Sequence, residues 1–227
     1  MKRLDSLLIV SCLILSSALM GSTHRVDLRL PAKAAVSIEE GDRILIAPFV
    51  LALAQSDEKP KTVIDVQLEL TDYLAKLLRK KKFDIVVDRA IVLPSANLDR
   101  LKADTEFWKE TITGYNAKYA LSGTVDFRVE DRSNYETEEF VSAYDKRTYL
   151  RQILVEKTGL ALEILLYVID AEGTVVKELP LKTFMDVEAR NYDQLQGFFE
   201  TIYPMEESIL NLFVPHKAKQ RRYLFGF

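Results

Sequence analysis

The sequence predicts an α/β protein of the α+β kind, with a mixed β-sheet of about five strands packed by three helices in the order βαβαβββα. Two observations carry this prediction. Short apolar runs that are typical of strands alternate with segments whose apolar residues recur every three or four positions, as on one face of a helix. Two long strand patterns then follow one another around a glycine turn. The composition, 48% hydrophobic and 29% charged in 227 residues, is that of a globular protein.

Strands and helices alternate in the first half of the predicted domain. Residues 43–49 form a continuous apolar run, which indicates a central strand buried on both faces. Residues 63–82 carry apolar side chains at helical spacing and end in a run of cations, which suits a helix C-terminus. A strand at 83–88 and a shorter helix at 97–112 follow. We interpret Trp108, the only tryptophan, as a core anchor on that helix.

Strands dominate the second half. Its first strand pattern alternates apolar and polar side chains, and the next two patterns are joined by a turn at Gly173. Pro180 is better tolerated at the edge of a sheet than in its centre, which places the last strand at an edge. The final helix is expected to bend near Pro204. The predicted elements are strands at 119–130, 159–169 and 173–184 and a helix at 192–212.

Residues 1–22 have the pattern of a secretory signal peptide, in which Lys2 and Arg3 precede an apolar run and small residues follow. Cys12 is the only cysteine, and two interpretations of it stay open. The segment IVSC at 9–12 resembles the lipidation motif of bacterial lipoproteins, so Cys12 would carry acyl chains that hold the protein on a membrane. Alternatively, Cys12 is a small apolar residue that is removed with the signal peptide. We expect a periplasmic protein, anchored to the outer membrane in the first case.

The rest of the chain divides into three parts. Residues 23–40 are an extended lead-in, and residues 41–212 are a single domain. Residues 131–158 interrupt that domain with a charged, tyrosine-rich insertion whose structure the sequence leaves ambiguous. Residues 213–227 form a basic and then aromatic tail, which we interpret either as a docked terminal segment or as an exposed handle for a partner.

Composition and motifs argue against several classes of function. The formal net charge of −3, with both signs spread along the chain, gives no basic stripe of the kind that binds nucleic acid. His24 and His216 lie outside the predicted domain, so neither a histidine base nor a zinc site is expected. No glycine-rich phosphate motif is present. We therefore expect no enzyme and no cofactor. The alternative is a hydrolase or a small-molecule or glycan-binding protein that uses acidic residues such as Asp126, Glu130 and Asp131.

Four short motifs carry a resemblance to a known family. They are a strand that ends in Pro-Phe at 48–49, an Ile-Val-Val strand at 85–87, the pattern Y-x-L-x-G-x-V at 119–125 and the turn D-A-x-G at 170–173. Across residues 41–212 the chain resembles the N-terminal domain of periplasmic TolB and its relatives, which include the curli secretion-channel subunit and the lipoprotein activator of penicillin-binding proteins. The resemblance implies a domain that binds protein partners or oligomerises, with Pro48-Phe49 as a strand stop.

The function implied is a non-enzymatic, protein-binding accessory domain of the cell envelope. Self-association as a subunit of an envelope ring or secretion channel is the alternative, although the insertion is too charged and alternates too poorly for a membrane-spanning hairpin. We expect partner contacts on the insertion, because Tyr and Arg are frequent in binding hot spots. The other possibility is that its aromatic residues pack locally against the sheet. The candidate contacts are Tyr135, Phe140, Tyr144, Arg147 and Tyr149.

Overall fold

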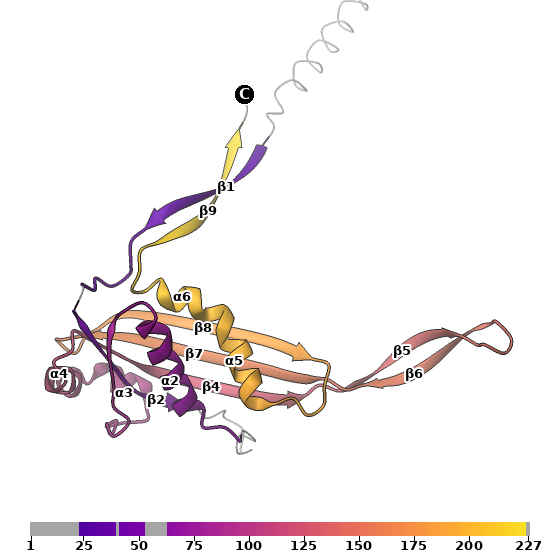
Figure 1. Ribbon diagram of the computed structural model, residues 1–227, viewed down its shortest axis with the longest axis horizontal. Helices are drawn as coiled ribbons and strands as arrows, with labels where there is room; N and C mark the ends of the chain where they lie inside the picture. Colours follow the sequence, from indigo (N-terminus) through magenta and orange to yellow (C-terminus); the bar gives the residue numbers. More distant parts are fainter. Residues whose placement is uncertain (1–22, 40, 53–62, 226–227) are drawn as a thin grey trace, which may run out of the picture. The chain divides into compact units, whose positions relative to one another are not determined.

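The computed structural model describes residues 23–39, 41–52 and 63–225 (Figure 1). The predicted signal peptide and Cys12 lie outside these residues. The described chain forms two compact units. Residues 35–213 contain a five-stranded sheet with its helices, and the segments before and after them form a two-stranded sheet.

The five-stranded sheet is mixed, in the order β3-β2-β4-β7-β8. The inner strand β2 is parallel to both of its neighbours, β3 and β4, whereas β4–β7 and β7–β8 are antiparallel pairs. The predicted fold class is therefore confirmed, and β8 with its Pro180 lies at an edge as expected. The strands are β2 (Arg43–Leu51), β3 (Asp84–Val87), β4 (Tyr119–Asp131), β7 (Thr158–Asp170) and β8 (Val175–Val187).

Side-chain caps set where the helices begin. Asp65 accepts a hydrogen bond from the Leu68 N–H, so the first helix begins after residue 65 rather than at 63. The single helix predicted at 97–112 is wrong, because Asp104 caps a second helix within it. The single helix predicted at 192–212 is also divided, because a short 3₁₀ turn that contains Pro204 separates two α-helices. The helical elements are α2 (Val66–Arg79), α3 (Leu98–Ala103), α4 (Thr105–Gly114), α5 (Gln194–Ile202), η1 (Tyr203–Met205) and α6 (Glu206–Leu210).

Helices pack on both faces of the sheet, which explains the continuous apolar run in β2. Residues 44–47 of that strand are fully buried, as predicted. On one face, the Phe198 ring of α5 packs edge-on against Phe127 of β4, with 5.6 Å between the ring centroids. On the other face, Trp108 of α4 is 1% exposed and its Nε1–H donates to the Leu101 carbonyl oxygen at 2.8 Å. The prediction that Trp108 anchors the core is confirmed.

Pro48 does not stop β2, so the prediction that Pro48-Phe49 ends this strand is wrong. The register between β2 and β4 shifts between Ile46 and Phe49, and the strand continues beyond this bulge to Leu51. A bulge leaves backbone groups out of the ladder, so a residue without an N–H is tolerated there. The carbonyl oxygen of Pro48 accepts a hydrogen bond from the Ser122 hydroxyl at 2.8 Å.

The lead-in and the tail pair with one another as an antiparallel ribbon. β1 (Thr23–Ala32) and β9 (His216–Phe225) are in register over their whole length, from the pair of residues 23 and 225 to the pair of residues 32 and 216. The tail is thus a terminal strand, and its partner is the lead-in. We call these two strands the terminal ribbon.

Candidate functional site: an exposed hairpin

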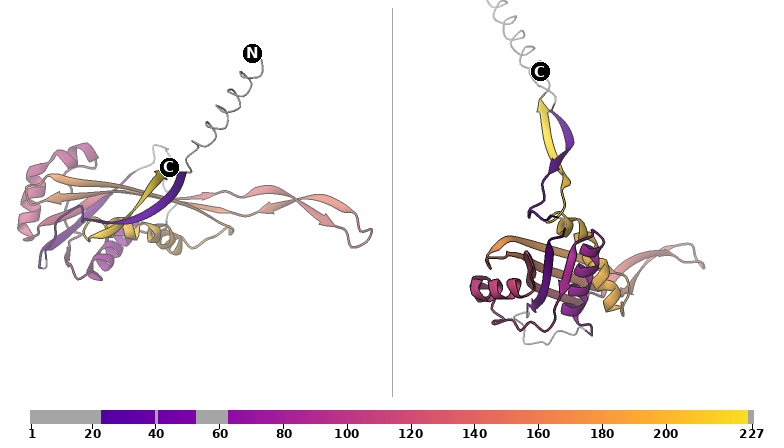
Figure 2. Two further views of the ribbon diagram at one scale, coloured as in Figure 1. Left: turned by 90° about the horizontal axis from the view of Figure 1, so that it is seen from above. Right: turned by 60° about the vertical axis from the view of Figure 1, so that its left-hand side comes forward.

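The insertion forms a β-hairpin that continues the β4–β7 pairing. β5 (Asn134–Val141) and β6 (Thr148–Val155) are antiparallel partners, and the backbone N–H of Arg132 donates to the Lys157 carbonyl oxygen at 2.9 Å between the two ladders. Figures 1 and 2 show the hairpin extending past the end of the five-stranded sheet. The structure that the sequence left ambiguous is therefore an extension of two core strands.

Arg132 organises the base of the hairpin. Its guanidinium lies 4.3 Å from the centroid of the Phe184 ring on β8, and its Nη2 lies 3.1 Å from the Glu130 carboxylate. Gly159 leaves the space for this side chain, because a Cβ at that position would lie 2.7 Å from the Arg132 Nε. A glycine that sequence analysis treated only as the start of a strand thus lets a cation stack across the sheet where the hairpin leaves it.

Hydrogen bonds within the loop hold the hairpin tip. The Ser142 N–H donates to the Arg147 carbonyl oxygen at 2.9 Å and closes the loop. The Asp145 carboxylate accepts hydrogen bonds from the Tyr149 hydroxyl and from the Arg147 N–H. The bond from the tyrosine is the main reason why the pKa of Asp145 lies below its ordinary value and that of Tyr149 above it. Tyr144, at the tip, is 99% exposed.

One face of the hairpin carries four exposed apolar side chains, interspersed with Thr137, Glu139, Thr148 and Gln152. Side chains directly opposite each other on paired strands share a face, and the face alternates along each strand. The register therefore places Tyr135 and Val141 of β5 on the same face as Leu150 and Leu154 of β6. Their exposed fractions, from 49% for Leu154 to 72% for Tyr135, show that nothing in the described chain covers them. Of this group, sequence analysis identified Tyr135 alone.

The opposite face combines aromatic and charged side chains. Phe140 and Tyr149 are directly opposed, with ring centroids 5.9 Å apart. The Arg151 guanidinium lies 5.2 Å from the Phe140 ring centroid and forms an ion pair with Glu138 at 2.8 Å. These contacts lie within the hairpin, so Phe140 and Tyr149 support its own structure as well as presenting a surface.

The structure divides the predicted contact residues into three places. Phe140 and Tyr149 meet on one face, Tyr135 lies on the other, and Tyr144 and Arg147 lie at the tip. Tyr135 and Tyr144 do not pack against the five-stranded sheet. Sequence analysis missed the aliphatic residues Val141, Leu150 and Leu154, although Leu150 and Leu154 stand four residues apart, a spacing that places both on one face of a strand.

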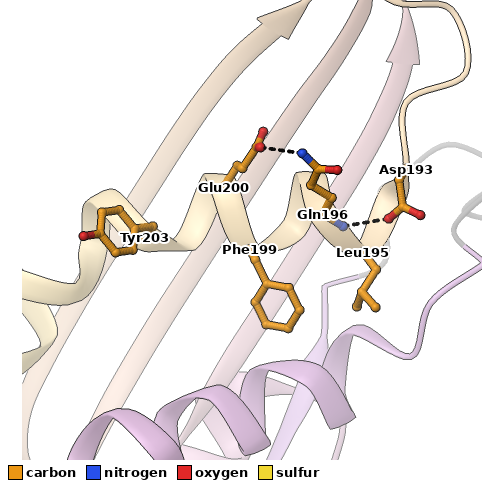
Figure 3. A pocket seen from close by; sticks show the side chains of 6 residues that line it. All are labelled: Asp193, Leu195, Gln196, Phe199, Glu200 and Tyr203. Carbon is orange, nitrogen blue, oxygen red and sulfur yellow. Dashed lines mark hydrogen bonds between the residues drawn. The ribbon is translucent and has the colours of Figure 1, made fainter.

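Two further arrangements in the described chain could bear chemistry. The first is an open hollow of about 690 Å³ along α5 (Figure 3). Phe199 and Leu195 point to the same side of the helix, and the Phe199 ring packs 5.9 Å from that of Tyr73 on α2. The Glu200 carboxylate accepts hydrogen bonds from the Gln196 amide and the Tyr192 hydroxyl, which lower its pKa. The remaining lining residues are Asp193, Gln196, Glu200 and Tyr203.

The second arrangement is a carboxylate pair that sequence analysis did not identify. Asp126 and Glu163 are directly opposed on β4 and β7. Burial raises the pKa of Asp126 above its ordinary value. Hydrogen bonds from Lys182 at 2.6 Å and from Arg128 at 2.7 Å lower the pKa of Glu163. These ion pairs give Glu163 a structural role on the sheet.

The acidic set proposed from sequence is not brought together. Asp126 belongs to the pair above, whereas the Glu130 carboxylate binds Arg132 at the hairpin base. The Asp131 carboxylate accepts the Ser133 N–H and caps the start of the insertion. Across the described ranges, no group of three or more His, Cys, Asp or Glu side chains is arranged to hold a metal ion. Nor does the described chain contain a helix with the length and hydropathy needed to cross a membrane.

Comparisons with known proteins match this chain to solved structures alone, at low identity. No family model and no curated protein matches the sequence. Among solved structures, a PelC dodecamer from Paraburkholderia phytofirmans is 17% identical, with a TM-score of 0.38 over 86% of this chain and 99% of that one. The hypothetical protein CT253 from Chlamydia trachomatis is 11% identical, with a TM-score of 0.36 over 75% and 91% of the respective chains. At these identities and scores the relation to the TolB family stays a prediction.

Proposed function

We propose that this chain is an exported, non-catalytic protein of the bacterial cell envelope that binds another protein through the β5–β6 hairpin. The observation that carries the proposal is the apolar face of that hairpin, formed by Tyr135, Val141, Leu150 and Leu154. Export is inferred from the signal-peptide pattern of residues 1–22, and the absence of catalysis from the motifs that the sequence lacks.

The strands β5 and β6 continue β4 and β7 but form a two-stranded segment of their own. Two strands with no third strand and no helix against them are only marginally stable in water. The hairpin also exposes four large apolar side chains on one face, and no other described strand pairs with the outer edges of β5 and β6. A partner that covered the face would gain about 1.5–3 kcal/mol for each large side chain that becomes fully buried. We therefore assign the hairpin as the binding element.

Strand addition is the binding mode that fits this geometry. An added strand would pair with the free edge of β6, where aliphatic and aromatic residues dominate, and its side chains would meet the apolar face. The paired edge of β6 is already used by β5, so the opposite edge is the one available. The predicted contacts at the tip, Tyr144 and Arg147, would then lie beside the end of the added strand.

Site-specific photo-crosslinking in cells tests the proposal. A photoreactive amino acid at Leu150 should give one adduct of defined mass, and the adduct should disappear in the background Val141→Ser with Leu154→Ser. The control position is Val92, which is 83% exposed but lies outside the hairpin. An equal pattern of adducts from both positions, or none from position 150, would contradict the proposal.

The same edges favour self-association as the second candidate. A second copy of the chain offers an identical unpaired strand, so two hairpins could pair through β6. The crosslinking experiment distinguishes the two cases, because an adduct at twice the mass of the chain identifies a second copy. Light scattering of the purified exported protein checks the result, and a monomer at high concentration excludes self-association.

A further inference from the structure

The terminal ribbon has one strongly basic face. Its register places Arg25, Asp27 and Arg29 of β1 opposite Tyr223, Arg221 and Lys219 of β9, and Lys217 follows on the same face. The Asp27 carboxylate lies 3.1 Å from Lys219, 3.7 Å from Arg221 and 3.8 Å from Arg25. Asp27 is the only acidic residue in segments 23–34 and 214–227, so one carboxylate faces five cations.

The opposite face of the ribbon is mainly apolar. It carries Val26, Leu28 and Leu30 of β1 and Ala218 of β9, and Gln220 and Arg222 are its polar members opposite Leu28 and Val26. Leu28 and Leu30 are 39% and 38% exposed. A two-stranded sheet has no interior, so neither of its faces can be buried by the ribbon itself. The ribbon is therefore amphipathic across its two faces.

Charge is distributed unequally between the two units. Segments 23–34 and 214–227 contain seven Lys and Arg residues against one Asp, a net charge of +6. Residues 35–213 contain 22 Lys and Arg residues against 32 Asp and Glu residues, a net charge of −10. The near-neutral total thus conceals a basic ribbon, which the overall charge gave no reason to expect.

We infer that the terminal ribbon lies on the surface of an anionic phospholipid bilayer. Elements that bind there combine an apolar face, which enters the boundary between headgroups and acyl chains, with Lys and Arg side chains that reach the phosphates. The ribbon has both features. In the sequence, residues 16–22 separate it from the apolar run at 7–15, which would carry the chain to a membrane during export. An acyl chain on Cys12 would be a second attachment, and two weak attachments together anchor a protein more stably than either alone.

An acidic surface on a second copy is the competing occupant. It would match the cations of the ribbon, but it would leave Leu28 and Leu30 without an apolar partner. A bilayer accounts for both faces. The inference does not depend on what the β5–β6 hairpin binds.

Vesicle flotation tests the inference. The protein is exported with the substitution Cys12→Ala, so that no acyl chain contributes, and is mixed with vesicles of phosphatidylglycerol and phosphatidylethanolamine or of phosphatidylcholine alone. We expect flotation with the anionic vesicles, and its loss at high salt. The variant Arg29→Gln, Lys217→Gln, Lys219→Gln should partition roughly 100-fold more weakly, which corresponds to about 1 kcal/mol for each cation.

A matched control removes three cations from the other unit. Lys80→Gln, Lys81→Gln, Lys82→Gln changes the net charge by the same amount just after α2, and it should leave flotation unchanged. A separate variant, Leu28→Ser with Leu30→Ser, should also bind weakly while every cation remains. Equal loss in the control, equal flotation with both kinds of vesicle, or no flotation would overturn the inference. A ribbon variant that changes only the oligomeric mass would identify a second copy as the occupant and overturn it as well.

Discussion

Replacing Gly123 with alanine would place a methyl group where β4 and β7 meet. Gly123 has φ +148°, and a Cβ built on it would lie 1.9 Å from the Leu165 carbonyl oxygen. The nearest atoms are backbone, so the strands themselves must separate by about 1.3 Å to reach a tolerable contact, which lengthens ladder hydrogen bonds beyond their working range. Two or three such bonds at about 1 kcal/mol each, with about 1–3 kcal/mol of backbone strain, predict a loss of about 3–6 kcal/mol.

Thermal unfolding followed by circular dichroism measures this loss. For a chain of this size 1 kcal/mol corresponds to about 2–4 °C, so the melting temperature should fall by roughly 10 °C. The control is Gly114→Ala, because a Cβ there would have no atom within 4 Å. At the end of α4 this change should be neutral or stabilise by up to about 1 kcal/mol. If Gly123→Ala melted together with the control, the close approach of β4 and β7 would be refuted.

Two further predictions concern titratable groups. Burial raises the pKa of Asp126, so ionisation disfavours the folded state and stability falls as the pH rises through that pKa. Asp126→Asn should therefore stabilise the protein at neutral pH by less than about 1 kcal/mol, because the carboxyl group is partly exposed. In urea unfolding the gain in stability should vanish at acidic pH. An equal gain at both pH values would contradict the raised pKa of Asp126. The Tyr73 hydroxyl donates to the Glu206 carboxylate at 2.5 Å and joins α2 to α6. Burial, followed by this hydrogen bond, raises the pKa of Tyr73. Tyr73→Phe should therefore lower the free energy of unfolding in urea by about 0.5–1.5 kcal/mol and remove one late-titrating group from the absorbance titration of the tyrosines. An unchanged titration would show that another tyrosine is the late-titrating group.

The elements that sequence analysis predicted well are those whose burial is a local pattern. The apolar run of β2 and the position of Trp108 follow from residue type and spacing, because each side chain meets the core wherever the strand or helix is placed. The division at Asp104 was missed although a signal for it was present, since an Asp directly before a helical segment can accept the backbone N–H three residues later and cap the helix. The bulge at Pro48 was not, because it depends on the register of β2 against β4, which lies more than 70 residues further along the chain.

From the sequence, the insertion could be predicted as an exposed contact surface but not as a hairpin of two strands. The insertion has no face turned towards a core, so burial imposes no strict alternation on it, and its charges concealed the two strands. Its register is inherited from β4 and β7, and this register decides that Tyr135 shares a face with Leu150 while Phe140 meets Tyr149.

The sequence by itself determined the strands of the five-stranded sheet, most of the helices and the side chains that enter the core. These properties depend on neighbouring residues. Only the tertiary structure decided which strands become partners. The pairing of β1 with β9 joins the two ends of the described chain, and no local pattern in either segment predicts its partner strand. That pairing gathers cations scattered over both ends onto one face, because the partner across a β-ladder is chosen by the fold of everything between them.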